Sequence, residues 1–314
     1  MRTIDIVLPV YSEEEGIEAF NEALFSVLGL LSDRYRFTVT YVLDPSPDNT
    51  FGVLKKLARA RSNIAVVHLS RRFGHQMSLV AGIDRSRGDA VIMMDCDQQH
   101  PPSAIPALLK KLEEGYDVVN TVRRYDAGTG LLKRSTSDLF YRVQNALSPV
   151  ELQEGAADFR LISRKVAAVF QNSIREQNQF LRGLFQWVGF RTATISFVAN
   201  PRSAGTTKYN LRRLLAFAIT GILSFSKLPL RAASVVGIII STVSLAYAIA
   251  LILYYFMARY VPPGYTSLIV LMLFLGGMQM VVLGILGEYL GSIFEEVKGR
   301  PLYVVDEVIQ EESL

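Results

Sequence analysis

The sequence contains little cysteine and little histidine. Cys96 is the one cysteine among 314 residues, which excludes an internal disulfide and a zinc site built from several cysteines. Three histidines are present, and neither His75 nor His100 has a partner at the spacing of a metal-binding motif. A reducing compartment fits such a chain.

The chain also lacks a large excess of charge. Its formal net charge of +4 is modest for 314 residues, which argues against nucleic acid as a partner. A membrane surface or a phosphorylated ligand is the more natural partner. The first residues, MRTIDIVLPVYSEEE, contain neither the long apolar stretch nor the small-residue cleavage site of a signal peptide. We therefore expect the N-terminus to stay in the cytoplasm.

Two stretches near the C-terminus contain no Asp, Glu, Lys or Arg, namely Ala232–Ala258 and Val261–Gly287. Each exceeds the roughly 20 apolar residues that cross a bilayer, and the mean hydropathy of the whole chain is +0.26. A Pro-Pro-Gly turn at 262–264 separates them. Basic residues flank the outer ends of the pair, whereas only Arg259 lies in the turn. This bias predicts a hairpin with both ends in the cytoplasm.

The predicted organisation has four parts. Residues 1–205 form a large cytoplasmic domain. Residues 206–231 form interfacial helices, because apolar side chains recur there at helical spacing; a core helix of the large domain is the alternative. Residues 232–291 hold two transmembrane helices, at about 232–258 and 264–290, and residues 292–314 form a cytoplasmic tail. The predicted location is the inner membrane of the cell.

Short β-branched runs alternate with helical stretches through the first third of the chain. Strands are predicted at Ile4–Val10, Tyr41–Leu43, Ala65–Leu69, Ala90–Met94 and Asp117–Asn120. Helices are predicted at Ile17–Leu31, Thr50–Ala60, His75–Ser86 and Ser103–Glu114, and further on at 135–147, 158–170 and 177–189. The alternation predicts an α/β fold with a mostly parallel sheet, in which ligands bind at the carboxyl ends of the strands.

Two carboxylates, Asp95 and Asp97, directly follow the predicted strand Ala90–Met94. Carboxylate oxygens hold hard divalent cations, which can grip phosphates at the same time. Asp44 and Asp48 follow an earlier strand and are expected at the same edge of the sheet. The sequence therefore predicts a Mg²⁺ or Mn²⁺ site at Asp95 and Asp97, with a solvated turn as the alternative.

Several segments carry a resemblance to a known family. They are PVYSEEE (9–15), VLDPSPDNT (42–50), SRRFGHQ (70–76), DCDQQHPP (95–102), GYDVVNTVRR (115–124), DFRLISR (158–164) and AGTTKYNLRRL (204–214). In this order they resemble the motifs of family 2 glycosyltransferases. More narrowly, they resemble the polyisoprenyl-phosphate glycosyltransferase branch, the GtrB-type and dolichyl-phosphate-mannose-synthase-like enzymes. The chain departs from the family pattern at Ser12, Pro45, Pro47 and Gln98.

The resemblance implies a GT-A (Rossmann-like) catalytic domain that binds a nucleotide sugar. By their place in the motifs, the residues that would bind this donor are Pro9, Tyr11, Glu13, Asp44, Asp95 and Gln98. Asp97, together with Asp95, would hold the Mg²⁺ or Mn²⁺ that bridges the diphosphate. The cation stabilises the negative charge that develops on the leaving nucleoside diphosphate.

The implied acceptor is a lipid phosphate. A phosphate monoester has a second pKa of about 6 and is largely dianionic at neutral pH, so it needs positive charge nearby rather than a strong base. The predicted acceptor-phosphate ligands are Arg123, Lys133, Arg134, Ser137 and Arg202. A solvated basic loop and contacts to lipid headgroups are the alternatives. Arg123 and Arg134 also belong, with Asp97 and Asp158, to the predicted catalytic set.

Asp158 occupies a motif position that resembles the acidic residue facing the sugar or the metal in this family. An N-cap of a following helix is its ordinary alternative. The segment QFLR at 179–182 partly resembles the QxxRW motif of processive synthases, but Gly183 stands where the tryptophan is expected. A single transfer is therefore favoured over polymerisation.

The implied reaction is inverting transfer of one hexose to a polyprenyl phosphate at the cytoplasmic membrane leaflet. UDP-glucose and undecaprenyl phosphate are the favoured substrates, and GDP-mannose-dependent mannosyl transfer is the second reading. A processive polysaccharide synthase and a non-catalytic nucleotide-sugar-binding membrane scaffold remain as further alternatives. Gly287 and Gly291 have the small-xxx-small spacing of close helix contacts, and the resemblance implies a homotetramer.

Overall fold

The structure is a computed structural model that describes residues 1–97, 99–124, 156–198, 228–258 and 264–310. The chain divides into two compact units. The first unit is Met1–Ser224 together with Pro301–Leu314, and the second is Phe225–Arg300. The first unit is therefore built from one segment that precedes the second unit in the sequence and one segment that follows it.

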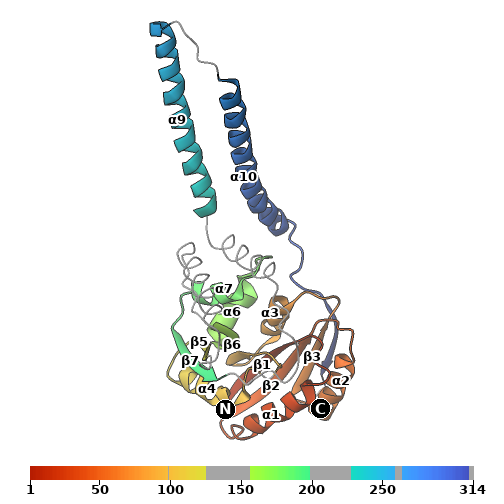
Figure 1. The fold of residues 1–314 in the computed structure, drawn as a ribbon. Coiled ribbons are helices and arrows are strands. Elements are labelled where there is room, and N and C mark those ends of the chain that lie inside the picture. Colours follow the sequence, from red (N-terminus) through yellow and green to blue (C-terminus); the bar gives the residue numbers. More distant parts are fainter. Residues whose placement is uncertain (98, 125–155, 199–227, 259–263, 311–314) are drawn as a thin grey trace. The chain divides into compact units, whose positions relative to one another are not determined.

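A mixed sheet forms the centre of the first unit (Figure 1), in the order β7-β5-β6-β4-β1-β2-β3-β8. Its strands are β1 (Arg2–Val10), β2 (Tyr35–Leu43), β3 (Ile64–Leu69), β4 (Ala90–Met93), β5 (Val118–Arg124), β6 (Ala156–Ser163), β7 (Thr192–Val198) and β8 (Val305–Gln310). Strands β1 to β4 are parallel to their neighbours within this set, and β5 is parallel to β7. Strand β6 is antiparallel to both β4 and β5.

Helices lie between the strands in the chain, and they pack on the sheet because each has one apolar stripe. They are α1 (Ile17–Gly29), α2 (Thr50–Ala60), α3 (His75–Arg85), the short 3₁₀ helix η1 (Pro102–Ala104), α4 (Ile105–Glu113), α6 (Arg164–Asn172) and α7 (Leu181–Trp187). In α1, for example, Ile17, Phe20, Leu24 and Leu28 are buried. Strands β1, β2 and β4 end at the same edge of the sheet, so the loops after Val10, Leu43 and Met93 meet there.

The predicted α/β class and the first five strands are confirmed, but the helix predicted over 158–170 is wrong in its first half. Residues Ala156–Ser163 form β6, and only then does the chain turn into α6. Phe159 and Leu161 are fully buried in the core of the sheet, while Arg160 between them is also buried. Pairing with β4 on one side and β5 on the other favours the extended backbone over the local helical preference.

A strand that the sequence reasoning did not anticipate lies near the C-terminus. Strand β8 pairs antiparallel with β3, with Val66 opposite Ile309 and Val67 opposite Val308. Most of its side chains are exposed, so it borders the sheet rather than adding to the core. The chain after the second unit therefore returns to the sheet that the N-terminal strand helps to build.

The second unit contains the two longest helices of the described chain, α9 (Leu228–Ala258) and α10 (Tyr265–Val297). Among the described residues, one helical segment, Phe274–Val297, is long and apolar enough to cross a membrane by length and composition. A shorter apolar stretch lies at Ala233–Tyr247. The predicted interfacial helices at 206–231 lie almost entirely outside the described residues.

Gly82 allows α3 to lie directly against β1. A Cβ atom at position 82 would come within 2.1 Å of Val7 Cγ1. Because Val7 is fully buried and has little room to move, we expect Gly82→Ala to lower the free energy of unfolding by about 1–3 kcal/mol. Gly29→Ala is the matched control, since a Cβ there meets nothing within 4 Å. Urea unfolding of both variants checks this, and an equal loss in the two would contradict it.

Candidate active site

An open pocket of about 240 Å³ lies at the carboxyl ends of the parallel strands. Residues from three strand ends and from the start of α3 surround it, in keeping with the rule for open α/β sheets. The lining residues are Pro9, Val10, Tyr11, Glu13, Asp44, Arg72, Gly74, His75, Ser78, Asp95, Cys96 and Asp97. Residues that were predicted to bind the nucleotide-sugar donor, from motifs far apart in the sequence, therefore line one pocket.

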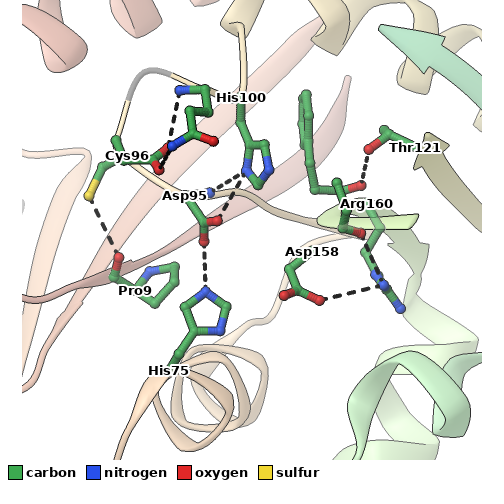
Figure 2. A network of polar contacts seen from close by, with 12 residues as sticks. Pro9, His75, Asp95, Cys96, His100, Thr121, Asp158 and Arg160 are labelled. Carbon is green, nitrogen blue, oxygen red and sulfur yellow. Dashed lines mark hydrogen bonds and ion pairs between the residues drawn. The ribbon is translucent and has the colours of Figure 1, made fainter. Parts of the chain in front are cut away.

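Asp95 and Asp97 form the acidic pair of the pocket, and two histidines contact Asp95 (Figure 2). His75 Nε2, from the first turn of α3, lies 2.7 Å from Asp95 Oδ1. The backbone N–H of Asp95 donates to His100 Nδ1 at 2.9 Å. The His100 ring is buried and stacks on Phe159, with the ring centroids 5.3 Å apart. Asp95 is thus fixed through both its carboxylate and its backbone.

The charges around Asp95 shift the pKa values of both histidines. Burial by itself would lower the pKa of His75, but the hydrogen bond and negative charge of Asp95 raise it to about 9. Burial would raise the pKa of Asp95, but His75 and His100 lower it. Burial also lowers the pKa of His100 against the opposing charge of Asp95. We infer a protonated His75 and a neutral His100 at neutral pH.

The shifted pKa of His75 gives a testable pH dependence. Because folding raises this pKa, the ion pair's contribution to stability is complete below about pH 6.5 and is lost as the pH rises through about 9. With three histidines in the chain, NMR of histidine-labelled protein should resolve a ring that titrates near pH 9. His75→Gln should remove that signal, and Asp95→Asn should return it toward the ordinary value. A His75 ring that titrates near 6.5 in the unchanged protein would refute the ion pair.

Asp97 is connected to a basic residue through Gln99. The Gln99 side-chain amide donates to Asp97 Oδ2 at 2.7 Å, and its backbone N–H donates to Asp97 Oδ1 at 3.1 Å. On its other side, Gln99 Oε1 accepts from the Arg123 guanidinium at 2.6 Å. A short chain of hydrogen bonds therefore joins the acidic pair to the first residue of the predicted acceptor site. The sequence reasoning missed Gln99 because no local pattern pairs it with Arg123.

The loop after β1 brings a third carboxylate to the pocket. The backbone N–H of Glu13 donates to Thr50 Oγ1 at 3.0 Å, and Thr50 Oγ1 donates to Asp48 Oδ1 at 2.8 Å. These bonds join the loops after β1 and β2. Burial and the charges of Asp97 and Asp95 raise the pKa of Glu13 to about 7. The raised pKa of Glu13 reflects its burial and the negative charge of the neighbouring carboxylates.

Asp44, the residue after β2, fixes the loop that leads into α3. Its carboxylate accepts the backbone N–H groups of Phe73 at 3.0 Å and of Gly74 at 2.8 Å. Gly74 has a φ of 94°, a conformation that favours glycine. The Arg72 guanidinium, from the same loop, lies 3.8 Å from the centre of the Tyr11 ring. The pocket lining thus includes an aromatic and a cationic group that contact each other, in addition to the carboxylates.

Asp158 lies at the start of β6 in a separate ion-pair cluster. Its carboxylate accepts from Arg182 Nε at 2.9 Å and from the terminal nitrogen at 2.8 Å, a bidentate arrangement. Arg160 lies 3.8 Å away and is 3% exposed in its side chain. Burial would raise the pKa of Asp158, but Arg182 lowers it well below its usual range. Asp158 is therefore ionised and paired, which suits a counterion better than a proton acceptor.

The predicted site residues fall into three groups. Those that line the pocket are Pro9, Tyr11, Glu13, Asp44, Asp95 and Asp97. Arg123 and Asp158 lie outside this lining, Arg123 joined to Asp97 through Gln99 and Asp158 paired with Arg182. Those outside the described residues are Gln98, Lys133, Arg134, Ser137 and Arg202. Cys96 is buried, with Sγ 3.6 Å from the Pro9 carbonyl oxygen.

The carboxylates around the pocket fit a divalent cation that has further ligands from a bound diphosphate. Within the described ranges, no group of three or more His, Cys, Asp or Glu side chains is arranged as a complete metal site. Asp97 nevertheless presents oxygen ligands beside Asp95, and Glu13 carries the raised pKa of a crowded negative site. Mg²⁺ is commonly bound in this way, through one or two carboxylates plus substrate phosphates.

Comparisons with known proteins identify the family. A similar solved structure is glucosyl-3-phosphoglycerate synthase from Mycobacterium tuberculosis in complex with Mn²⁺, uridine-diphosphate-glucose and phosphoglyceric acid. Its match to this chain has a TM-score of 0.43 and 21% sequence identity, and it covers 71% of this chain and 78% of that one. An uncharacterized glycosyltransferase of Synechocystis sp. is 42% identical over 305 residues, 97% of this chain and 95% of the relative. The prophage bactoprenol glucosyl transferase homolog of Escherichia coli is 37% identical, over 97% and 99%. Residues 5–170 match Glycosyl transferase family 2. The chain belongs to this family and is a glycosyltransferase.

Proposed function

We propose that the protein transfers a single hexose from a nucleotide sugar to a polyprenyl phosphate, with inversion, at the cytoplasmic leaflet of the inner membrane. The favoured substrates are UDP-glucose and undecaprenyl phosphate. The observation that carries the proposal is the hydrogen-bonded chain from Asp97 through Gln99 to Arg123, which joins the acidic pocket to a cation of the kind that binds phosphate. The bactoprenol glucosyl transferase homolog of E. coli, matched over nearly its full length, supports the lipid acceptor.

The donor end of the reaction uses the pocket at the strand ends. The Tyr11 ring and Arg72 offer a stacking surface and a positive charge to a nucleotide. Asp97, with Asp95 beside it, would hold Mg²⁺ or Mn²⁺, which when bound stabilises the charge of the departing nucleoside diphosphate. His75 and His100 fix Asp95, and Gln99 fixes Asp97, so both carboxylates are oriented before the donor binds.

The acceptor end needs positive charge and no strong base. A lipid phosphate is already largely dianionic at neutral pH, so it can attack the anomeric carbon once it is positioned. Arg123 is the described cation closest in the hydrogen-bond network to Asp97, and Lys133, Arg134, Ser137 and Arg202 are proposed to extend its site. Since Asp158 is already paired with Arg182, we propose that it orients that arginine.

The path of the chain supports the proposed membrane topology. Strand β1 precedes α9 and α10, strand β8 follows them, and both strands belong to the same sheet. This path supports a topology in which both ends of the helical unit lie on the same side of a membrane. We propose a cytoplasmic catalytic part, interfacial helices at 206–231 and two membrane helices within 232–291. A homotetramer is proposed from the family resemblance, and the small-residue spacing at Gly287 and Gly291 suits close helix contacts.

The direct test is the mass of the lipid product. Full-length protein in detergent is incubated with a short-chain polyprenyl phosphate, Mg²⁺ or Mn²⁺, and UDP-glucose or GDP-mannose in separate reactions. A lipid that gains one hexose residue with UDP-glucose supports the proposal. A gain only with GDP-mannose would replace the donor, products with several hexoses would indicate a processive synthase, and an unmodified lipid with every donor would contradict the transfer.

A further inference from the structure

The segment that follows α10 belongs to the first unit and contacts its N-terminal part at several points. We call residues 301–310 the C-terminal strap. Leu302 is buried, the Val304 carbonyl accepts the backbone N–H of Ser70 at 2.9 Å, and the rest of the strap pairs with β3 as strand β8. These contacts join residues separated by more than two hundred positions in the sequence, so no local pattern could have indicated them.

The Ser70 contact lies at the start of a loop that lines the donor pocket. We call residues 70–74 the donor loop. It begins after β3 with Ser70, carries Arg72 to the Tyr11 ring, and ends at Gly74, where Asp44 holds the backbone. Among the described contacts, the loop backbone is therefore held at one end by Asp44 and at the other by the strap.

The strap also holds the last turn of the helix that follows the donor loop. The Tyr303 hydroxyl donates to Asp84 Oδ2 at 2.8 Å. The Arg175 guanidinium, from the segment after α6, donates to both oxygens of the same carboxylate, at 2.8 Å and 2.9 Å. Tyr303 therefore connects the strap to α3, the helix whose first turn carries His75 into the site. Tyr303 is adjacent in the sequence to Val304, whose carbonyl accepts the backbone N–H of Ser70.

We propose that the C-terminal strap is a positioning element for donor binding, and that Tyr303 is the residue that holds it in place. Tyr303 acts on the donor loop through Val304 and on α3 through Asp84, without touching the donor pocket. Loss of its hydroxyl leaves the Val304–Ser70 bond supported by the buried Leu302 and by the pairing of β8 with β3. The donor loop then samples more conformations, and ordering it on donor binding costs affinity. The kinetic part of this inference rests on the proposed function.

The strap has a second attachment that provides a matched control. At β8, Lys55 Nζ lies 3.3 Å from Glu307 Oε2, an exposed pair remote in sequence from the donor loop. Removing it with Lys55→Ala perturbs the same strap at a point that neither Ser70 nor Asp84 contacts. A purely structural role of the strap predicts similar effects of the two variants. A positioning role predicts an effect of Tyr303→Phe alone.

The experiment compares full-length wild type, Tyr303→Phe and Lys55→Ala in two measurements. The first is steady-state transfer from UDP-glucose at saturating polyprenyl phosphate. We expect Tyr303→Phe to raise the KM for the donor about threefold to tenfold, the effect of losing one hydrogen bond, with kcat and the KM for the acceptor unchanged. The second is hydrogen exchange of the donor-loop amides, where Phe73 and Gly74 should exchange faster in Tyr303→Phe and as in wild type in Lys55→Ala.

Two results would overturn the inference. One is an unchanged donor KM and unchanged exchange in Tyr303→Phe; the other is an equal change in Lys55→Ala. If the wild type transfers no sugar to the lipid, the proposed function fails, but hydrogen exchange at Phe73 and Gly74 still decides whether the strap holds the donor loop. The two failures are therefore distinguishable.

Discussion

Asp97→Ala is expected to lower sugar transfer by about a thousandfold, the loss seen when one group that stabilises developing charge is removed. The reason is local. Asp97 is the carboxylate that Gln99 orients through two hydrogen bonds, and it lines the pocket beside Asp95. Under the proposed mechanism, the divalent cation would lose a ligand and the departing nucleoside diphosphate would lose electrostatic stabilisation. Initial rates of nucleoside diphosphate release with saturating lipid phosphate measure the effect.

The matched control for Asp97→Ala is Glu114→Gln, which removes an acidic group that pairs with Lys111 at the protein surface. This variant should keep wild-type activity, because exposed pairs contribute little. Both variants should remain folded and inserted, as judged by their melting temperatures. Activity in Asp97→Ala within tenfold of wild type would show that the metal and the leaving group do not depend on this carboxylate.

Asp158→Ala is expected to cost about 3 kcal/mol of folding free energy, as for removal of one partner of a buried ion pair. Arg182 and Arg160 would then lack their carboxylate, and Arg160 is almost fully buried. Because folding lowers the pKa of Asp158, its contribution is present above the unfolded pKa of about 3.9 and is lost as the pH falls below it. Urea unfolding at pH 7 measures the first effect, and a pH series that extends from about 4 down to about 2 measures the second.

The double variant Asp158→Ala/Arg182→Ala separates a counterion from a general base. If Asp158 serves to hold Arg182, the double variant should be about as active as Arg182→Ala, and the unfolding free energies should be non-additive. If Asp158 instead accepts a proton during transfer, its removal should lower the rate further in the Arg182→Ala background. That second result would contradict the assignment of Asp158 as a counterion.

Much of the donor site could be predicted from the sequence because its residues follow strands that end at one edge of the sheet. Asp44 and Asp95 directly follow predicted apolar runs, Asp97 is two residues beyond Asp95, and Glu13 was assigned through the family resemblance. The parallel topology brings the strand ends together. The continuous β-branched apolar runs that predict these strands are local signals. The acidic residues could therefore be placed without any knowledge of tertiary contacts.

The features that could not be predicted depend on long-range contacts. Strand β6 was expected to be helical, and its pairing with β4 and β5 decides otherwise. Strand β8 has few buried side chains, so its sequence gives a weak strand signal, and it is ordered by pairing with β3. The Gln99–Arg123 and Asp158–Arg182 contacts each join residues 24 positions apart, beyond the reach of any motif spacing used here.

The central claim is that a carboxylate-bound divalent cation and a lipid phosphate act together to release the nucleoside diphosphate. The most direct measurement is release of UDP from UDP-glucose by the purified full-length protein, with and without polyprenyl phosphate and before and after chelation. The account predicts that release requires both the lipid phosphate and the cation, and that added Mg²⁺ or Mn²⁺ restores it. Rapid release in chelated protein, or release that does not respond to the lipid phosphate, would contradict the account.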